Sequence, residues 1–272
     1  MPTVATHSEA VMFAAIDAVK AYWEQGGKGV LGLHLEGPYL NIVKRGAHLK
    51  QFIKHNPPLN EVKKLLNYGR GVIKMMTIAP EIVSDEVIEL LQKNGVILSM
   101  GHSNATFVEA KNAIAKGINA ATHLFNAMSP FQHRELGVVG AIYDDVNSCS
   151  SIVADGYHVD FQAIKISKTI LKERLFLITD AVTENLNGQY SHRLEGDKYV
   201  IADGTLSGSA LTMLKAVQNC VEKIGISLEE SLRMASLYPA RIVHLEHQLG
   251  RIEKGFSDDF VVFNDNYTKI NF

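Results

Sequence analysis

Short hydrophobic runs recur along the first two thirds of the chain, each followed by polar residues and then by a helical pattern. In one of them, residues 96–100 are followed by the polar residues 101–104 and by an amphipathic stretch, 105–116, that Gly117 ends. About seven runs fit this description when the short first one is counted: 2–6, 30–35, 72–78, 96–100, 118–122, 150–154 and 175–179. Buried strands that alternate with helices predict a parallel sheet covered on its faces.

The choice between parallel folds depends on where the polar residues lie. A doubly wound sheet usually carries a glycine-rich phosphate loop after its first strand, and neither G-x-G-x-x-G nor a P-loop lysine motif is present. Ligand-type residues instead follow several different strands, as in barrel active sites. We therefore expect an α/β fold, a (β/α)8 TIM-type barrel over residues 1–245. With about seven strands found, it should lack its first strand and expose a sheet edge for a partner to cover.

The pattern changes beyond Asp180. Residues 188–204 predict a β-hairpin inserted before the last helices, which are expected over 210–224 and 228–242. Residues 249–263 predict a turn and strands that leave the barrel, so 246–272 form a second part. Earlier in the chain, Ser84 is expected to accept a hydrogen bond as the N-cap of the helix that follows Glu81.

Composition and charge exclude several classes of protein. The 272 residues are 46% hydrophobic and 21% charged, as in ordinary globular proteins. A net charge of −2 gives no basis for binding nucleic acid or an anionic membrane. No apolar run reaches the ~18–20 residues of a membrane helix, and no signal peptide is evident. The two cysteines are too few for a disulfide framework. We expect a reduced, cytoplasmic enzyme.

Glu36, His102 and His123 each follow a different predicted strand. Carboxylate and imidazole groups are ligands for zinc, iron or manganese, and three protein ligands with water make a catalytic metal site. A single histidine is more often a packed core residue, but three ligands at one barrel end favour a metal. His34, two residues before Glu36, is interpreted as a core histidine that supports Glu36 from behind.

Further polar residues lie in loops at the same expected end of the barrel. Asp180 follows a buried strand, where a carboxylate either caps the next segment or transfers the proton of an attacking water. His158, His48 and Arg134 are candidate substrate donors, and an arginine there can grip a phosphate or simply be a solvated charge. Residues 206–208 could offer backbone N–H groups at a helix start.

Several of these segments resemble the N-acetylglucosamine-6-phosphate deacetylase family of the amidohydrolase superfamily. The resemblance is carried, in family order, by LHLEGP at 33–38, GHSNA at 101–105, ATHLFNAM at 121–128, ADGYHVD at 154–160, TDA at 179–181 and GTLSGS at 204–209. These motifs are long and spread over nearly the whole chain.

The resemblance implies hydrolysis of the acetamide of N-acetylglucosamine 6-phosphate to acetate and glucosamine 6-phosphate. It implies one divalent metal on Glu36, His102 and His123, zinc first and iron, manganese or cobalt as alternatives, with Asp180 as the acid and base. The substrate-binding residues that it implies are Ala47, His48, Asn126, Ala127, Arg134, His158, Leu206, Ser207 and Gly208. His158 and the metal would stabilise the oxyanion, and Arg134 would bind the phosphate. We also expect a homodimer.

The chain departs from the family pattern at its start. Family members usually begin with strands of a small β-sandwich and a first barrel strand, so 246–272 is expected to be a remnant of that sandwich. The absence of a His-x-His pair favours a single metal. Two alternatives stay open: an inactive barrel that serves as a binding protein, and another amidohydrolase of the dihydroorotase or adenine deaminase type. The dihydroorotase type needs a lysine that bridges two metals, and Lys74 lies too early in its strand to reach the metal end.

Overall fold

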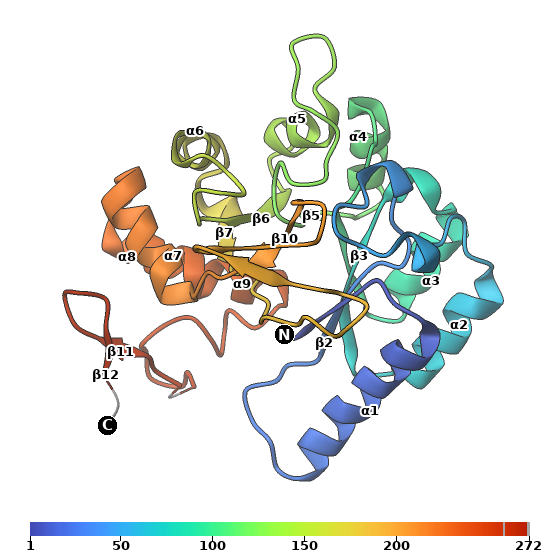
Figure 1. Ribbon diagram of the computed structural model, residues 1–272, viewed down its shortest axis with the longest axis horizontal. Coiled ribbons are helices and arrows are strands. Elements are labelled where there is room, and N and C mark those ends of the chain that lie inside the picture. Colours follow the sequence, from blue (N-terminus) through green and yellow to red (C-terminus); the bar gives the residue numbers. More distant parts are fainter. Residues whose placement is uncertain (258, 271–272) are drawn as a thin grey trace. The chain divides into compact units, whose positions relative to one another are not determined.

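The computed structural model describes residues 1–257 and 259–270, which divide into two compact units, Met1–Ser148 and Cys149–Phe272. The first unit alternates strands with helices (Figure 1). Its strands are β1 (Thr3–Ala5), β2 (Leu33–Glu36), β3 (Ile73–Ile78), β4 (Ile97–Met100) and β5 (Ala120–Ala121). Its helices are α1 (Glu9–Glu24), α2 (Leu59–Tyr68), α3 (Asp85–Lys93), α4 (Phe107–Ala115) and α5 (Gly137–Asp144), with 3-10 turns η1 (Ile42–Lys44), η2 (Lys50–Phe52) and η3 (Pro80–Ile82).

The strands of the first unit pair in sequence order and all in parallel. All four residues of β2 are buried, and the strands carry few exposed residues, because helices cover a parallel sheet. In α3 the buried residues Val87, Ile88 and Leu91 form one face, whereas Asp85 and Glu86 lie in the first turn, where the helix dipole favours negative charge.

The second unit begins with a parallel pair of strands and continues with an antiparallel sheet and helices. The pair is β6 (Cys149–Val153) and β7 (Leu175–Ile178), joined through α6 (Phe161–Leu171) and the 3-10 turn η4 (Lys172–Arg174). The antiparallel sheet is β8 (Arg193–Glu195), β9 (Lys198–Val200) and β10 (Leu206–Ser209). After it come α7 (Met213–Asn219), the π-helix η5 (Cys220–Ile224), α8 (Leu228–Ala235), α9 (Leu237–Ile242), β11 (Val262–Phe263) and β12 (Lys269–Ile270).

The order of strands and helices predicted from the sequence is confirmed, with seven parallel-paired strands. Three local predictions were wrong. Within the described residues, the Ser84 side chain accepts no hydrogen bond at the N-cap of α3. Residues 206–208 lie in strand β10 and not at a helix start, and α7 begins only at Met213. The helix expected over 228–242 is interrupted at Ser236, whose φ of −133° is not helical.

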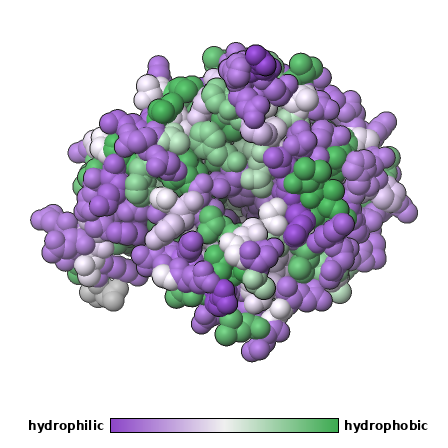
Figure 2. Space-filling model, turned by 45° about the horizontal axis from the view of Figure 1, so that its top comes forward, coloured by the Kyte–Doolittle hydropathy of each residue, from purple (hydrophilic) through white to green (hydrophobic). Residues whose placement is uncertain are grey.

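On the face in Figure 2 hydrophilic side chains predominate, and hydrophobic ones form separate patches. Among the described residues, no helix is long and apolar enough to cross a membrane.

Candidate metal centre

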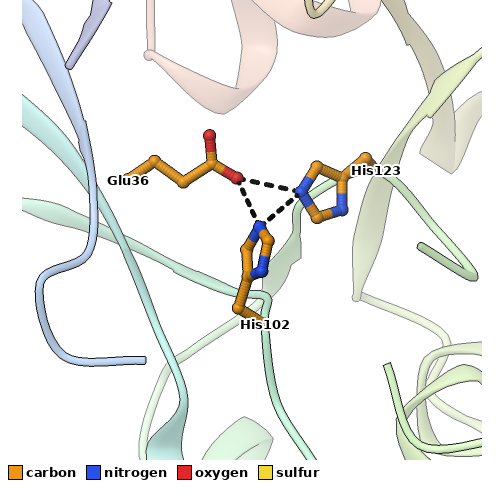
Figure 3. A group of neighbouring side chains, drawn as sticks. All are labelled: Glu36, His102 and His123. Atoms are coloured by element: carbon orange, nitrogen blue, oxygen red, sulfur yellow. Dashed lines mark hydrogen bonds and ion pairs between the residues drawn. The ribbon is translucent and has the colours of Figure 1, made fainter. Parts of the chain in front are cut away.

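Three side chains of the first unit converge on one point (Figure 3). Oε1 of Glu36 lies 2.9 Å from Nε2 of His102 and 2.9 Å from Nε2 of His123, and the two nitrogens are 3.1 Å apart. Donor atoms about 2.0 Å from a tetrahedral ion lie about 3.3 Å from one another, so this triangle has nearly the size of one face of a zinc site. The three residues are buried and form a group that can hold a metal ion.

Strand pairing explains this convergence. Glu36 ends β2, while His102 and His123 each follow the last residue of their strand, β4 or β5, by two positions. Met100 pairs with Ala121, so both histidines leave the sheet at the same level. Both also have left-handed backbones, with φ of +47° at His102 and +40° at His123, a conformation that costs energy for residues with a side chain.

The protonation of His102 favours a cation in the triangle. Its Nδ1 lies 2.8 Å from the carbonyl oxygen of Lys44, which can only accept, so Nδ1 carries the proton of a neutral ring. Nε2 of the neutral ring carries no proton and faces the carboxylate oxygen of Glu36, so two acceptor atoms lie 2.9 Å apart without a hydrogen bond between them. A positive ion resolves this mismatch, and a partner on the far nitrogen is typical of metal-ligating histidines.

The electrostatics of the group agree with this protonation. Burial, together with the nearby His48, lowers the pKa of His102 to about 4, so the ring is neutral at pH 7. Burial alone would raise the pKa of Glu36, but the imidazoles of His102, His123 and His48 hold it well below its usual value. At neutral pH the group is therefore one carboxylate with neutral imidazole beside it, the protonation state that metal binding needs.

His48 belongs to the immediate surroundings of this group. It is 6% exposed, and its ring meets the ring of His102 edge-on with centroids 4.3 Å apart. Its Nδ1 accepts the backbone N–H of Thr6 at 3.2 Å, so Nε2 carries the proton of the neutral ring and points toward Glu36 from 3.8 Å. Ala47, the other predicted residue of this loop, is half-buried beside it.

His34 anchors a chain of buried hydroxyl groups. Its Nε2 lies 2.7 Å from Oγ1 of Thr77, which lies 2.7 Å from Oγ1 of Thr122, and its Nδ1 is 3.1 Å from Oγ1 of Thr3. Ser99 continues the chain at 2.6 Å from Thr122. Because Thr122 precedes His123 and Thr77 pairs with Glu36, His34 supports the ligand strands indirectly, through hydroxyl groups.

His34 should make the stability of the metal-free protein depend on pH. Burial lowers its pKa to about 4 from the ordinary 6.5, so below pH 6.5 the unfolded chain binds a proton that the folded one refuses. Between pH 7 and pH 5 this difference removes about 2 kcal/mol of unfolding free energy. His34→Gln keeps polar atoms beside the threonines and should lose about that much of the pH dependence in urea unfolding. His133→Gln, at an exposed histidine, should keep the wild-type dependence, and equal slopes for wild type and His34→Gln would contradict the assignment.

The loop after His123 holds three of the predicted substrate residues. Asn126 donates from Nδ2 to the carbonyl oxygens of His123 and Leu124, both at 3.3 Å, and Ala127 has a φ of +48°. Arg134 is exposed. Its neighbour Glu135 accepts the N–H groups of Phe107 and Gly137 at 2.8 and 3.0 Å, which ties the loop to the starts of α4 and α5.

In the second unit, Asp180 lies two residues beyond β7 with a φ of +49°. Strand β10 fixes its backbone, because the N–H of Ser209 donates to the carbonyl oxygen of Asp180 at 2.7 Å and the N–H of Val182 donates to Ser209 at 3.0 Å. On the same strand, Oγ of Ser207 lies 2.8 Å from Nδ1 of His192. Burial lowers the pKa of His192, and the charge of Asp180 acts in the opposite direction. The sequence analysis did not identify His192 as a residue near the site.

His158 is held by a carboxylate that the sequence analysis did not single out. Its Nδ1 donates to Oδ2 of Asp155 at 2.6 Å, and Oδ1 of Asp155 accepts the backbone N–H groups of Tyr157 and His158 at 2.9 Å each. Burial alone would raise the pKa of Asp155, but these donors hold it below its usual value. The spacing of three residues between Asp155 and His158 was the available signal.

Lys74 lies far from the ligand ends of the strands. It is the second residue of β3, and its side chain covers Gly32, just before β2 begins, where an added Cβ would meet Lys74 Cγ at 2.5 Å. A lysine at the start of the strands cannot bridge metals at their carboxyl ends. This position argues against the metal arrangement of the dihydroorotase type.

Comparison with known proteins agrees with the fold and shows the family. The family model described as "Amidohydrolase family" matches residues 2–272. The N-acetylglucosamine-6-phosphate deacetylases of Haemophilus influenzae and Homo sapiens are 37% and 38% identical to this chain, over 99% and 88% of it and 73% and 62% of their own lengths. The crystal structure of the deacetylase of that name from Pasteurella multocida superposes with a TM-score of 0.93 at 36% identity, over 99% of this chain and 72% of that one. The chain belongs to the amidohydrolase family, whose members are metal-dependent hydrolases.

Proposed function

We propose that the chain hydrolyses the acetamide of N-acetylglucosamine 6-phosphate, giving glucosamine 6-phosphate and acetate. The observation that carries the proposal is the triangle of Glu36, His102 and His123, with its ionised carboxylate and neutral imidazole. The deacetylases named above, to which the chain is 36–38% identical, support the choice of substrate.

The proposed cofactor is one divalent metal on these three residues. One carboxylate oxygen and two imidazole nitrogens suit zinc first, and iron, manganese and cobalt accept the same donors. When bound, such an ion supplies a Lewis acid and lowers the pKa of bound water toward ~7.

The proposed acid and base is Asp180. Its carboxylate takes one proton from the attacking water and returns it to the sugar nitrogen as the C–N bond breaks, so acetate and a free amine leave together. Support comes from its position after β7 and from the two backbone hydrogen bonds that fix its left-handed conformation. A carboxylate that must act twice in one turnover benefits from such fixed geometry.

The substrate contacts are proposed as follows. His158 is held by Asp155 through Nδ1, and in its imidazolium form it would donate Nε2–H to the oxyanion that forms on the acetamide. Asn126 and Ala127 are proposed to contact the sugar, and the segments with Ala47 and His48 and with Leu206, Ser207 and Gly208 to cover the substrate. Arg134 binds the phosphate.

The function is tested by measuring acetate release from the zinc-loaded chain. One equivalent of acetate per glucosamine 6-phosphate is expected, with loss of activity in EDTA and recovery on adding zinc. The C4 epimer and the unphosphorylated sugar are parallel substrates that define specificity. A folded chain that binds zinc and releases no acetate from any of them would overturn the proposal in favour of a binding protein.

Arg134→Ala should weaken the binding of the phosphorylated substrate far more than the binding of the free sugar. A lost hydrogen bond to a charged group costs about 1.5–3 kcal/mol, or roughly 10- to 150-fold in affinity. The measurement is KM for N-acetylglucosamine 6-phosphate and for N-acetylglucosamine, with the exposed Arg193→Ala as a control on total charge. Equal losses for the two sugars would show that Arg134 does not bind the phosphate.

We also propose that the parallel strands form a TIM-type barrel and that 246–272 belongs to a small β-sandwich. The strands β11 and β12 have only two residues each, and Ile252, Phe260 and Val261 are more than half exposed. A groove of about 810 Å³ lies between this segment and the helices α7 and α8. Such exposed apolar residues favour packing against further strands. The homodimer and the cytoplasmic location stay predictions.

A further inference from the structure

His102 needs support that its own sequence does not provide. Its φ of +47° is unfavourable for any residue with a side chain, and it persists only where the surroundings impose it. Its Nε2 must nevertheless stay 2.9 Å from Glu36 and 3.1 Å from His123. A small rotation of this backbone would move the nitrogen out of the triangle.

The carboxylate of Glu81, at the start of the loop after β3, joins the segments around His102. Its Oε1 accepts the backbone N–H of Asn104 at 2.7 Å and Nδ2 of Asn41 at 2.9 Å, and its Oε2 accepts the hydroxyl of Ser103 at 2.8 Å. Ser103 and Asn104 are the two residues that follow His102. One carboxylate therefore fixes the chain directly after the ligand.

Asn41 closes the arrangement from the other side. Its backbone N–H donates to the carbonyl oxygen of His102 at 2.9 Å, while its side chain donates to Glu81. The loops after β2, β3 and β4 are thus joined through Glu81 and Asn41, and His102 lies between them. Hydrogen bonds to a charged acceptor are roughly twice as strong as neutral ones, which suits a carboxylate to holding an unfavourable backbone.

We infer that Glu81 is a positioning residue for the metal site: it holds His102 in its left-handed conformation and so sets the metal affinity. The hydrogen bonds of the Glu81 carboxylate go to Asn41, Ser103 and Asn104, so it acts on His102 through the backbone of residues 102–104. The inference rests on the proposed metal site. It goes beyond that site by assigning part of its affinity to a carboxylate outside the ligand set.

The test compares zinc affinity in Glu81→Ala, Glu81→Gln and a control. Losing a group that orients a ligand typically weakens metal binding by about 10- to 100-fold, and this is expected for Glu81→Ala. Glu81→Gln keeps one carbonyl oxygen for Asn41 and Asn104, and its amide can donate to Ser103, so its affinity should lie between alanine and wild type. The control Glu86→Ala removes an exposed carboxylate from α3 and should bind zinc like wild type.

Zinc dissociation constants come from competition with a chromophoric chelator, and the Co²⁺ absorption spectrum reports the ligand geometry. A purely structural Glu81 would lower the melting temperature of the metal-free variants but leave the zinc affinity and the Co²⁺ spectrum of the folded protein unchanged. That result overturns the inference. If Glu81→Ala does not fold, Glu81→Gln serves as the test on its own. A zinc affinity equal to wild type in Glu81→Gln would also contradict the inference.

A double-mutant cycle with Ser103→Ala adds a second measurement. If Ser103 acts through Glu81, its loss should weaken zinc binding less in the Glu81→Ala background than in wild type. Fully additive losses would contradict the coupling. If the wild-type protein binds no zinc, the proposed metal site itself is wrong. If Glu81→Ala binds zinc as tightly as wild type, only the role of Glu81 is wrong.

Discussion

His102→Ala is expected to lose the metal and the activity together while the fold survives. In the proposed site the ring supplies one of the three donors, and its loss should weaken zinc binding more than the about 10- to 100-fold typical of residues that merely orient a ligand. The fold should persist because His102 lies in the loop after β4, so its replacement removes no strand pairing. Deacetylation should fall to the level of the EDTA-treated wild type.

The same variant has a thermodynamic signature. Metal that binds only the folded state stabilises it by RT ln(1 + [L]/Kd), about 2.7 kcal/mol at a hundredfold excess over Kd. Zinc should therefore raise the melting temperature of wild type but not of His102→Ala, while the two metal-free proteins melt close together. The exposed His133→Ala is the matched control and should respond to zinc like wild type. One equivalent of zinc retained by His102→Ala would remove His102 from the ligand set.

The grouping of Glu36, His102 and His123 could be predicted because strand order brings their segments to one end of the sheet. Parallel strands bring their carboxyl ends to one edge, so Glu36, His102 and His123 needed only to lie at the carboxyl ends of β2, β4 and β5 in one sheet. The hydrophobic runs located those strands to within a few residues, although β5 proved to be only two residues long. Short-range pattern and sheet geometry were sufficient here.

The residues around the candidate metal site and around Asp180 could not be predicted in this way. Glu81 ends a strand run in the sequence, and only the packing of three loops brings its carboxylate to Ser103 and Asn104. His192 lies in a polar segment, and its contact with Ser207 depends on strand β10. That strand was misread because Thr205–Ser209 has the composition of a helix entry, whereas pairing with Val200 makes it a strand.

Backbone conformation was the least predictable feature of the site. His102, His123 and Asp180 all have positive φ, a conformation that few residues with a side chain adopt. Tertiary hydrogen bonds impose it, from Asn41 on His102 and from Ser209 on Asp180. Strained backbones cluster where function needs a fixed geometry, so the sequence rules fail at the residues proposed to do the chemistry.

Asp180→Asn should separate catalysis from binding. The amide has nearly the shape of the carboxylate but cannot take the proton of water, so kcat should fall by at least about 10²-fold while KM and zinc content change little. Asn tolerates the left-handed backbone well, so the φ of +49° and the hydrogen bond from Ser209 should persist. The control is Asp197→Asn, at an exposed carboxylate in the turn between β8 and β9, which should keep wild-type turnover. Two results would count against the assignment: near-native turnover would place the base elsewhere, and loss of zinc would make Asp180 a part of the metal site.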